Sequence, residues 1–191
     1  MAILPIVTYN DPILRKEAKP VVELNEDLGV LIADMFETMY NSNGVGLAAP
    51  QIGKSIQLFV INADTMTEEL DDEEDLGAMV FINPKILTTE GVMVKLEEGC
   101  LSIPDVRDEV SRHDRITVTY RNRHFEEKTE EFSGWVSRVI QHEYDHLKGV
   151  LFLDHLSSFK RRFHRSTLKK IDTGLLETDY PVVPKQVKQP K

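Results

Sequence analysis

The residues of this 191-residue chain with the clearest chemical signal are His142, Glu143 and His146. They form the pattern H-E-x-x-H within a segment, residues 133–148, that predicts a helix ending just before Gly149. Residues i and i+4 share one helix face, so both imidazoles can reach one metal ion. The glutamate can then act as a general base toward a water molecule there. The alternative is a helix in which the two histidines have no catalytic role.

Two histidines leave a metal site incomplete, so the third ligand decides the class of protein. Zinc proteases with a longer form of the motif have a third histidine where this chain has Phe152. Others take a glutamate from a later helix, and only Glu177 follows the motif, in a proline-rich segment. Asp154 and His155 stand at no familiar spacing. A zinc protease with a downstream ligand is therefore poorly supported.

Upstream, the single cysteine, Cys100, is the other candidate for the third ligand. A lone cysteine is more often a small buried apolar residue. Here Gly99 precedes it and permits close approach of the backbone, and a nearby cation would stabilise the thiolate. One thiolate and two imidazoles suit Fe(II) or Zn(II) and leave a fourth position for water, as in a catalytic site. A non-catalytic module held by a metal would need a fourth protein ligand, and none is evident near these three.

A third segment, residues 44–51 with the sequence GVGLAAPQ, is rich in glycine and alanine. Residues this small let a substrate backbone lie alongside, and Gln51 offers an amide N–H to an oxyanion. The segment lacks the spacing of dinucleotide-binding and P-loop sequences, which argues against phosphate binding. Taken alone, it predicts only a loop.

The elements that must position these segments follow from periodicity. Residues 24–40 are amphipathic at helical spacing, with Asn25 as N-cap, and residues 157–171 predict a third, basic helix. Short strands are predicted at 56–62, 79–83, 91–97, 115–120 and 127–132. Because strict βαβ alternation is absent, we expect an α+β fold with antiparallel sheets packed around a central helix that carries the H-E-x-x-H motif.

In this order, GVGLAAPQ, EGCLS (98–102) and QHEYDHL (141–147) resemble the three signature motifs of the peptide deformylases. The resemblance covers most of the chain, from residues 10–21 through 149–156. It implies a hydrolase that removes the formyl group from the N-terminal formylmethionine of nascent polypeptides and releases formate. The implied cofactor is one divalent metal ion, Fe(II) in the cell, with Zn(II), Ni(II) or Co(II) as substitutes.

The resemblance also implies a role for each matching residue. Metal-bound hydroxide would attack the formyl carbon, with Glu143 as general acid/base. Gln51 and the backbone N–H of Leu101 would hold the formyl oxygen. The implied metal ligands are Cys100, His142 and His146.

Further residues are implied around the substrate. Arg107 matches a family arginine beside the site, and we expect it to pair with Glu98. Arg138 stands at a position that is usually apolar in the family, so the resemblance leaves the polarity of the methionine pocket open. The residues implied in substrate binding are Gly44, Val45, Gly46, Glu98, Gly99, Arg107 and Val139.

Composition excludes several other classes of protein. No apolar run is long enough to span a bilayer, and the first residues lack the features of a secretory signal or a transit peptide. The single cysteine precludes an internal disulfide, so we expect a cytoplasmic protein. The formal net charge of −9 argues against a general nucleic-acid-binding protein.

The charge is unevenly distributed along the chain. Residues 155–191 hold nine Lys and Arg against three Asp and Glu, whereas residues 68–75 hold seven acids in eight positions, which is typical of a solvated loop. We expect one catalytic domain over residues 1–171, including the basic helix, and an irregular tail over 172–191. The expected partners are formylmethionyl peptides and the ribosome, bound through the basic helix, with a solvated helix as the alternative. No DNA or membrane partner is expected.

Overall fold

The structure is a computed structural model that describes residues 1–62 and 76–184, so the acidic segment 68–75 lies outside the described residues. The longer elements are α1 (Glu26–Asn41), β3 (Leu58–Asn62), β4 (Ala78–Cys100), β5 (Ile103–Arg121), β6 (Glu127–Ser133), α3 (Gly134–Leu147), α4 (Ser158–Phe163) and α5 (Arg165–Asp172). The shorter elements are β1 (Ile6–Val7), η1 (Pro12–Arg15), β2 (Gly46–Ala48), η2 (Ala49–Ile52), η3 (Phe152–His155) and β7 (Val182–Val183).

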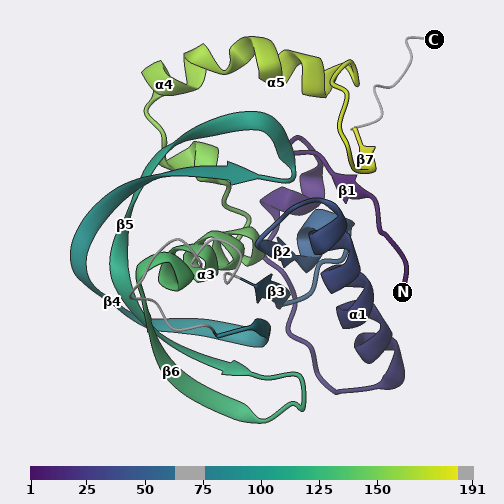
Figure 1. The fold of residues 1–191 in the computed structure, drawn as a ribbon, viewed down its shortest axis with the longest axis vertical. Coiled ribbons are helices and arrows are strands. Elements are labelled where there is room, and N and C mark those ends of the chain that lie inside the picture. Colours follow the sequence, from purple (N-terminus) through teal and green to yellow (C-terminus); the bar gives the residue numbers. More distant parts are fainter. Residues whose placement is uncertain (63–75, 185–191) are drawn as a thin grey trace.

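A five-stranded antiparallel sheet in the order β2–β3–β4–β5–β6 surrounds the centre of the molecule. β4 and β5 form one long hairpin with four register shifts, and Figure 1 shows both strands curving around α3. Such shifts bend and twist a strand, which lets the hairpin wrap around a helix. The sequence predicted only pieces of these strands, because residues 87–90, which lie between two predicted pieces of β4, are all exposed and lack an alternating apolar pattern.

Helix α3 lies inside this curved sheet. Ten of its 14 residues are buried, among them Val136, Val139 and Ile140, which pack in a core cluster with Phe59 and Phe81 of the sheet. The predicted α+β fold, with an antiparallel sheet packed around the helix that carries the H-E-x-x-H motif, is confirmed. Because the polar residues of α3 are buried as well, they need partners inside the protein.

The first predicted helix corresponds to α1. The side chain of Asn25 accepts a hydrogen bond from the Leu28 N–H at 2.9 Å, which is the N-cap contact that the sequence predicted. The apolar face of α1 packs on β2 and β3 through residues such as Met35 and Met39, which are fully buried. Among the described residues, no helix combines the length and apolar character needed to cross a membrane.

The C-terminal region differs from its prediction in two ways. The single helix expected over residues 157–171 is two helices, α4 and α5, which meet at His164 and lie outside the curved hairpin (Figure 1). The tail expected to be irregular contains β7, which pairs in parallel with β1 so that Ile6 faces Val182. That strand could not be predicted locally, because its partner comes from the opposite end of the chain.

Candidate metal and catalytic site

The three predicted ligands, Cys100, His142 and His146, come together where the end of β4 meets α3. Their ligand atoms all lie within 4.8 Å of one another, and Cys100 Sγ is 3.3 Å from His146 Nε2. Metal bonds to sulfur and imidazole nitrogen are about 2.0–2.3 Å long, so one ion fits among donors at this separation. The residues present therefore fit a divalent ion that favours soft ligands.

Glu98 fixes the first histidine of the motif. One of its carboxylate oxygens is 3.0 Å from His142 Nδ1, which leaves Nε2 of that ring for a ligand. Arg112 donates to both oxygens at 2.7 and 3.0 Å, and Arg138 donates to one at 2.6 Å. Burial raises the pKa of the Glu98 carboxyl, but the hydrogen bonds from His142 and Arg112 outweigh it and hold the pKa well below its usual range. Glu98 is thus a buried carboxylate shared by three cationic or polar groups.

The pKa values of the two histidines are shifted in opposite directions. Burial alone would lower the pKa of His142, but its contacts with Cys100 and Glu98 raise the pKa well above the usual value. Burial, followed by the charge of His142, lowers the pKa of His146. A divalent cation bound here would compete with protons for these imidazoles, because a metal binds the neutral ring.

Glu143 lies beside this cluster with its side chain enclosed. Its Oε2 is buried and has no hydrogen-bond partner within the described residues. A Cβ atom at Gly46 would lie 2.4 Å from Oε1 of Glu143, so only glycine fits against this carboxyl group. Burial raises the pKa of Glu143 to about 7. A carboxyl group with this pKa can both take up and release a proton near neutral pH.

The side-chain amide group of Gln51 points toward the candidate metal ligands, next to Cys100. It is 1% exposed, and its Oε1 accepts a hydrogen bond from the Ala48 N–H at 2.8 Å. This contact orients the amide so that Nε2 lies 3.5 Å from Cys100 Sγ and 3.4 Å from Ser102 Oγ. Leu101 lies between those two residues in the turn of the β4–β5 hairpin.

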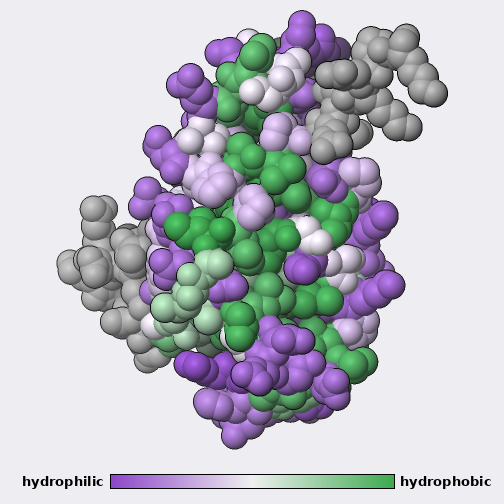
Figure 2. Space-filling view, turned by 90° about the vertical axis from the view of Figure 1, so that its right-hand side faces the viewer, coloured by the Kyte–Doolittle hydropathy of each residue, from purple (hydrophilic) through white to green (hydrophobic). Residues whose placement is uncertain are grey.

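A cleft of about 800 Å³ opens in front of these groups. Figure 2 shows a band of apolar side chains on the face that carries α1, β1 and β7. The cleft is lined by every residue predicted to bind substrate, namely Gly44, Val45, Gly46, Glu98, Gly99, Arg107 and Val139.

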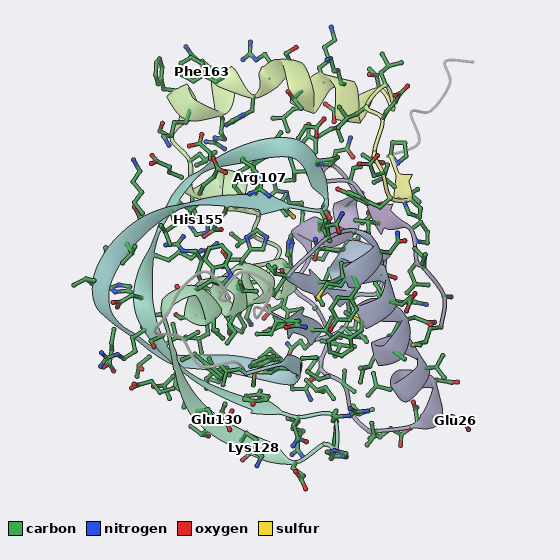
Figure 3. All side chains as sticks on the ribbon, in the orientation of Figure 1. Glu26, Arg107, Lys128, Glu130, His155 and Phe163 are labelled. Carbon is green, nitrogen blue, oxygen red and sulfur yellow. The ribbon has the colours of Figure 1, made fainter. Side chains whose placement is uncertain are left out.

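The expected pairing of Arg107 with Glu98 is wrong. Arg107 Nη1 lies 3.6 Å from Glu97 Oε1, and both side chains are more than 60% exposed. The reason is the register of the hairpin: Arg107 faces Gly99, so it shares a face with Glu97, whereas Glu98 points to the opposite face. Figure 3 shows Arg107 on the hairpin, on the side of α4 and α5.

Arg138 lines the cleft, but its guanidinium group binds other groups of the protein. Besides Glu98, it donates to the carbonyl oxygens of Val94 at 2.6 Å and Val110 at 3.0 Å. Its side chain is 4% exposed. The guanidinium is therefore neutralised by Glu98 and held by backbone groups, which limits its effect on the polarity of the cleft.

Sequence reasoning missed several residues at this site. Arg112 also donates to Asp145 at 2.9 Å, and Asp145 contacts His155 Nε2 at 2.8 Å, so a polar chain leads from Glu98 to the surface. Residues 177–180 line the cleft although they are far from the motifs in sequence. Neither feature has a local sequence signal, because both depend on which strands and segments lie side by side.

Fold and site together define a class of protein. It is the class of hydrolases that carry an H-E-x-x-H motif on a helix and whose third candidate ligand comes from a strand upstream of that helix. A family model described as polypeptide deformylase matches residues 3–162, and this chain belongs to that family of hydrolases. The resemblance seen in the three motifs is thereby confirmed.

Individual relatives agree over nearly the whole chain. Peptide deformylases of Flavobacterium psychrophilum and Salinibacter ruber are 47% and 50% identical to it; each match covers 96% of this chain, and 99% and 95% of the respective relative. The solved peptide deformylase of Legionella pneumophila superposes with a TM-score of 0.80 at 42% identity, covering 90% of this chain and 96% of that one. The enzyme of Ehrlichia chaffeensis in complex with actinonin gives a TM-score of 0.81 at 40% identity, covering 89% and 98%.

Proposed function

We propose that this protein is a cytoplasmic, metal-dependent enzyme that hydrolyses the formyl group from N-terminal formylmethionine of nascent polypeptides and releases formate. The observation that carries the proposal is the convergence of Cys100, His142 and His146 beside the enclosed carboxyl group of Glu143. Membership in the deformylase family supplies the substrate class. The competing class, a zinc protease, would need a ligand downstream of the helix, and the third donor lies upstream instead.

One divalent ion would be held by Cys100, His142 and His146, with Fe(II) as the ion in the cell and Zn(II), Ni(II) or Co(II) as substitutes. The donor set supports this choice, because a thiolate and imidazoles are softer ligands than Mg(II) or Ca(II) prefer. When bound, the ion would supply a Lewis acid and lower the pKa of a water molecule toward about 7.

Glu143 would move the protons of the reaction. Its Oε2 is buried and lacks a protein partner among the described residues, so it is available to accept a proton from the attacking water. The same carboxyl group would then give that proton to the departing amine nitrogen of methionine. A pKa of about 7 makes both transfers feasible at neutral pH.

Gln51 and Leu101 would stabilise the negative charge that develops on the formyl oxygen. The Gln51 amide is fixed by its contact with the Ala48 N–H, and a donor fixed in advance is worth about 3 kcal/mol to the transition state. The backbone N–H of Leu101 would be the second donor. Because a formyl carbon carries only hydrogen, a narrow site would admit it and exclude a bulkier acyl group.

The substrate peptide would lie in the cleft along the small residues Gly44–Gly46 and beside Gly99. The methionine side chain would contact Val139, which is buried in the cleft wall on α3. Arg107, which lies at the rim, is two-thirds exposed and would contact the peptide beyond the methionine.

The deciding experiment measures formate release from formyl-Met-Ala without oxygen, on protein loaded with Fe(II) or Ni(II). We expect formate release and no cleavage of internal peptide bonds; the reverse result would refute the proposal. Cys100→Ala should lose the bound metal, and full metal occupancy with full activity would contradict the ligand set. Glu143→Ala should retain the metal and lose turnover by several orders of magnitude.

We further propose one domain that continues beyond residue 171 and a ribosome contact through α4 and α5. The pairing of β7 with β1 supports the first point, because it ties the end of the described chain to its beginning. For the second, Phe159 and Phe163 are 66% and 71% exposed and stack edge to face among the basic residues of α4. Exposed aromatic and cationic side chains suit RNA.

The ribosome contact is tested by substitution rather than deletion, because deleting residues 157–191 would also remove β7. Arg161→Gln with Arg162→Gln removes charge from α4 and leaves the Lys160–Asp108 ion pair that attaches α4 to the hairpin. We expect weaker, less salt-dependent pelleting with ribosomes. Equal pelleting by variant and unaltered protein would refute the contact.

A further inference from the structure

The segment that follows α5, residues 174–184, returns across the molecule to the cleft, and we refer to it as the C-terminal strap. It starts at Gly174, whose φ of +67° lets the chain reverse just after the helix ends. It is held at its far end by β1: the Ile6 N–H donates to the Pro181 carbonyl at 2.9 Å, and Val182 and Val183 pair with Ile6 and Val7. The strap is therefore fixed at both ends.

Tyr180 lies in this strap directly before the paired residues. Its hydroxyl donates to the carbonyl oxygen of Leu101 at 2.9 Å, and its ring packs with Leu101 against the core cluster that contains Met35 and Met39. Residues 177–180 also line the cleft. A side chain from the end of the chain thus contacts the turn that carries one of the proposed oxyanion donors.

Besides the contact of Gln51 with Ser102, several contacts from outside the hairpin hold the turn at Leu101 and Ser102. The Tyr9 N–H, next to β1, donates to the Ser102 carbonyl at 2.9 Å. The side chain of Leu101 lies so close to Gly44 that a Cβ atom there would be 2.8 Å from Leu101 Cδ1. Tyr180 supplies a further contact, and this contact is made to the backbone of Leu101 itself.

We propose that Tyr180 is a positioning residue for deformylation: its hydroxyl holds the Leu101 carbonyl and so keeps the Leu101 N–H aimed at the formyl oxygen. The proposal rests on the proposed function, in which that N–H stabilises the oxyanion. Fixing the carbonyl restricts rotation at Leu101, whose N–H lies on the other side of the same Cα atom. The family match ends at residue 162, so the strap supplies this contact from outside the matched segment.

The test is Tyr180→Phe, which removes the hydroxyl and keeps the ring. The control is Tyr120→Phe, because the Tyr120 hydroxyl donates to Glu130 at 2.5 Å on β5 and β6, and Tyr120 does not line the cleft. With both variants at equal metal content, we expect Tyr180→Phe to lower kcat for formyl-Met-Ala about tenfold, since a misaimed donor costs less than the 10²–10³ of a missing one. Its KM should stay within twofold, and Tyr120→Phe should change neither constant.

A second substrate separates positioning from general loosening of the fold. The sulfur of thioformyl-Met-Ala accepts hydrogen bonds weakly, so it gains little from a well-aimed N–H. We therefore expect the kcat effect of Tyr180→Phe to shrink to less than threefold on the thioformyl substrate. A variant that merely loosened the site would slow both substrates equally.

Two results would overturn the positioning role: an unchanged kcat in Tyr180→Phe, whether or not KM rises, or equal slowing of both substrates. Failure of the proposed function looks different, because the unaltered protein itself would then release no formate. The expected pattern is a kcat loss that is specific to the variant and to the oxygen substrate.

Discussion

Gly46→Ala offers a direct test of the role of Glu143, because the added methyl group would occupy the space of the carboxyl group. The Cβ atom would lie 2.4 Å from Oε1 and 2.8 Å from both Cγ and Cδ of Glu143, whereas ordinary contact begins near 3.4 Å. The carboxyl group would have to move by about 1 Å. A displacement of this size at a catalytic group costs about 10² in rate.

The assay compares kcat/KM for formyl-Met-Ala between unaltered protein and Gly46→Ala at equal metal content. We expect a loss of about a hundredfold with the metal retained, because the methyl group contacts Glu143 rather than a ligand atom. The matched control is Gly29→Ala on α1, where an added Cβ atom has nothing within 4 Å. That substitution should leave kcat/KM unchanged and raise stability by about 0.5–1 kcal/mol, since alanine favours a helix over glycine.

One result would refute the role of the Glu143 position, and another would contradict the expected retention of the metal. If Gly46→Ala retains full kcat/KM, the position of the Glu143 carboxyl does not limit the reaction. If the variant loses its metal along with its activity, the methyl group has disturbed the ligands, and the loss says nothing about Glu143. The structure predicts that Gly46→Ala has full metal content and a lower kcat/KM than the unaltered protein.

Two further predictions concern charges around the site. Glu98→Gln leaves Arg112 and Arg138 without their buried anion and should lower the free energy of unfolding by about 3–5 kcal/mol, measured with denaturant. It should also lower the metal affinity about 10–100-fold, measured by titration. Unchanged values for both would contradict the hydrogen-bond network around Glu98. At the α4 contact, burial raises the pKa of Asp108, but hydrogen bonds from Lys160 and His164 outweigh it and lower the pKa from 3.8 to about 2. A depressed carboxyl pKa stabilises the fold above pH 3.8, and that contribution, about 1 kcal/mol after solvent screening, is lost as pH falls through 2. Asp108→Asn should remove it, so thermal unfolding of the variant and the unaltered protein should differ at pH 7 and converge near pH 2; a constant difference would refute the assignment.

The candidate ligands were predictable because their signal lies in residue type and short spacing. His142 and His146 are brought together by one turn of helix, which the sequence around them specifies. Cys100 comes from another element: its residue type made it a candidate, and the resemblance of EGCLS to a deformylase motif implied that it is the third ligand. The structure brings all three together within 4.8 Å.

Features that depend on register were harder to predict. Arg107 was expected to pair with Glu98 because it matches a family arginine beside the site, but the alternation of β4 turns Glu97, not Glu98, toward it. A shift of one residue reverses the face on which every side chain of a strand lies, and no composition pattern reports it. The partners of Glu98 are instead Arg112 and Arg138, one on the paired strand and one on α3.

Features that depend on distant segments had no local signal at all. β7 is only two residues long, and it forms because β1 presents Ile6 and Val7 to it from the other end of the chain. The cleft wall at residues 177–180 follows from that pairing.

The parallel pairing of β1 with β7 joins the two ends of the described chain. The cleft lies beside this pair, because residues 177–180, which precede β7, line it. Contacts between residues so far apart in sequence form late, because the whole intervening chain must first be ordered. Synthesis runs from the N-terminus, so β1 waits for its partner until Val182 and Val183 have been made and have left the ribosome. We therefore expect the cleft to remain unfinished until β7 has emerged, and catalytic capacity to begin only then.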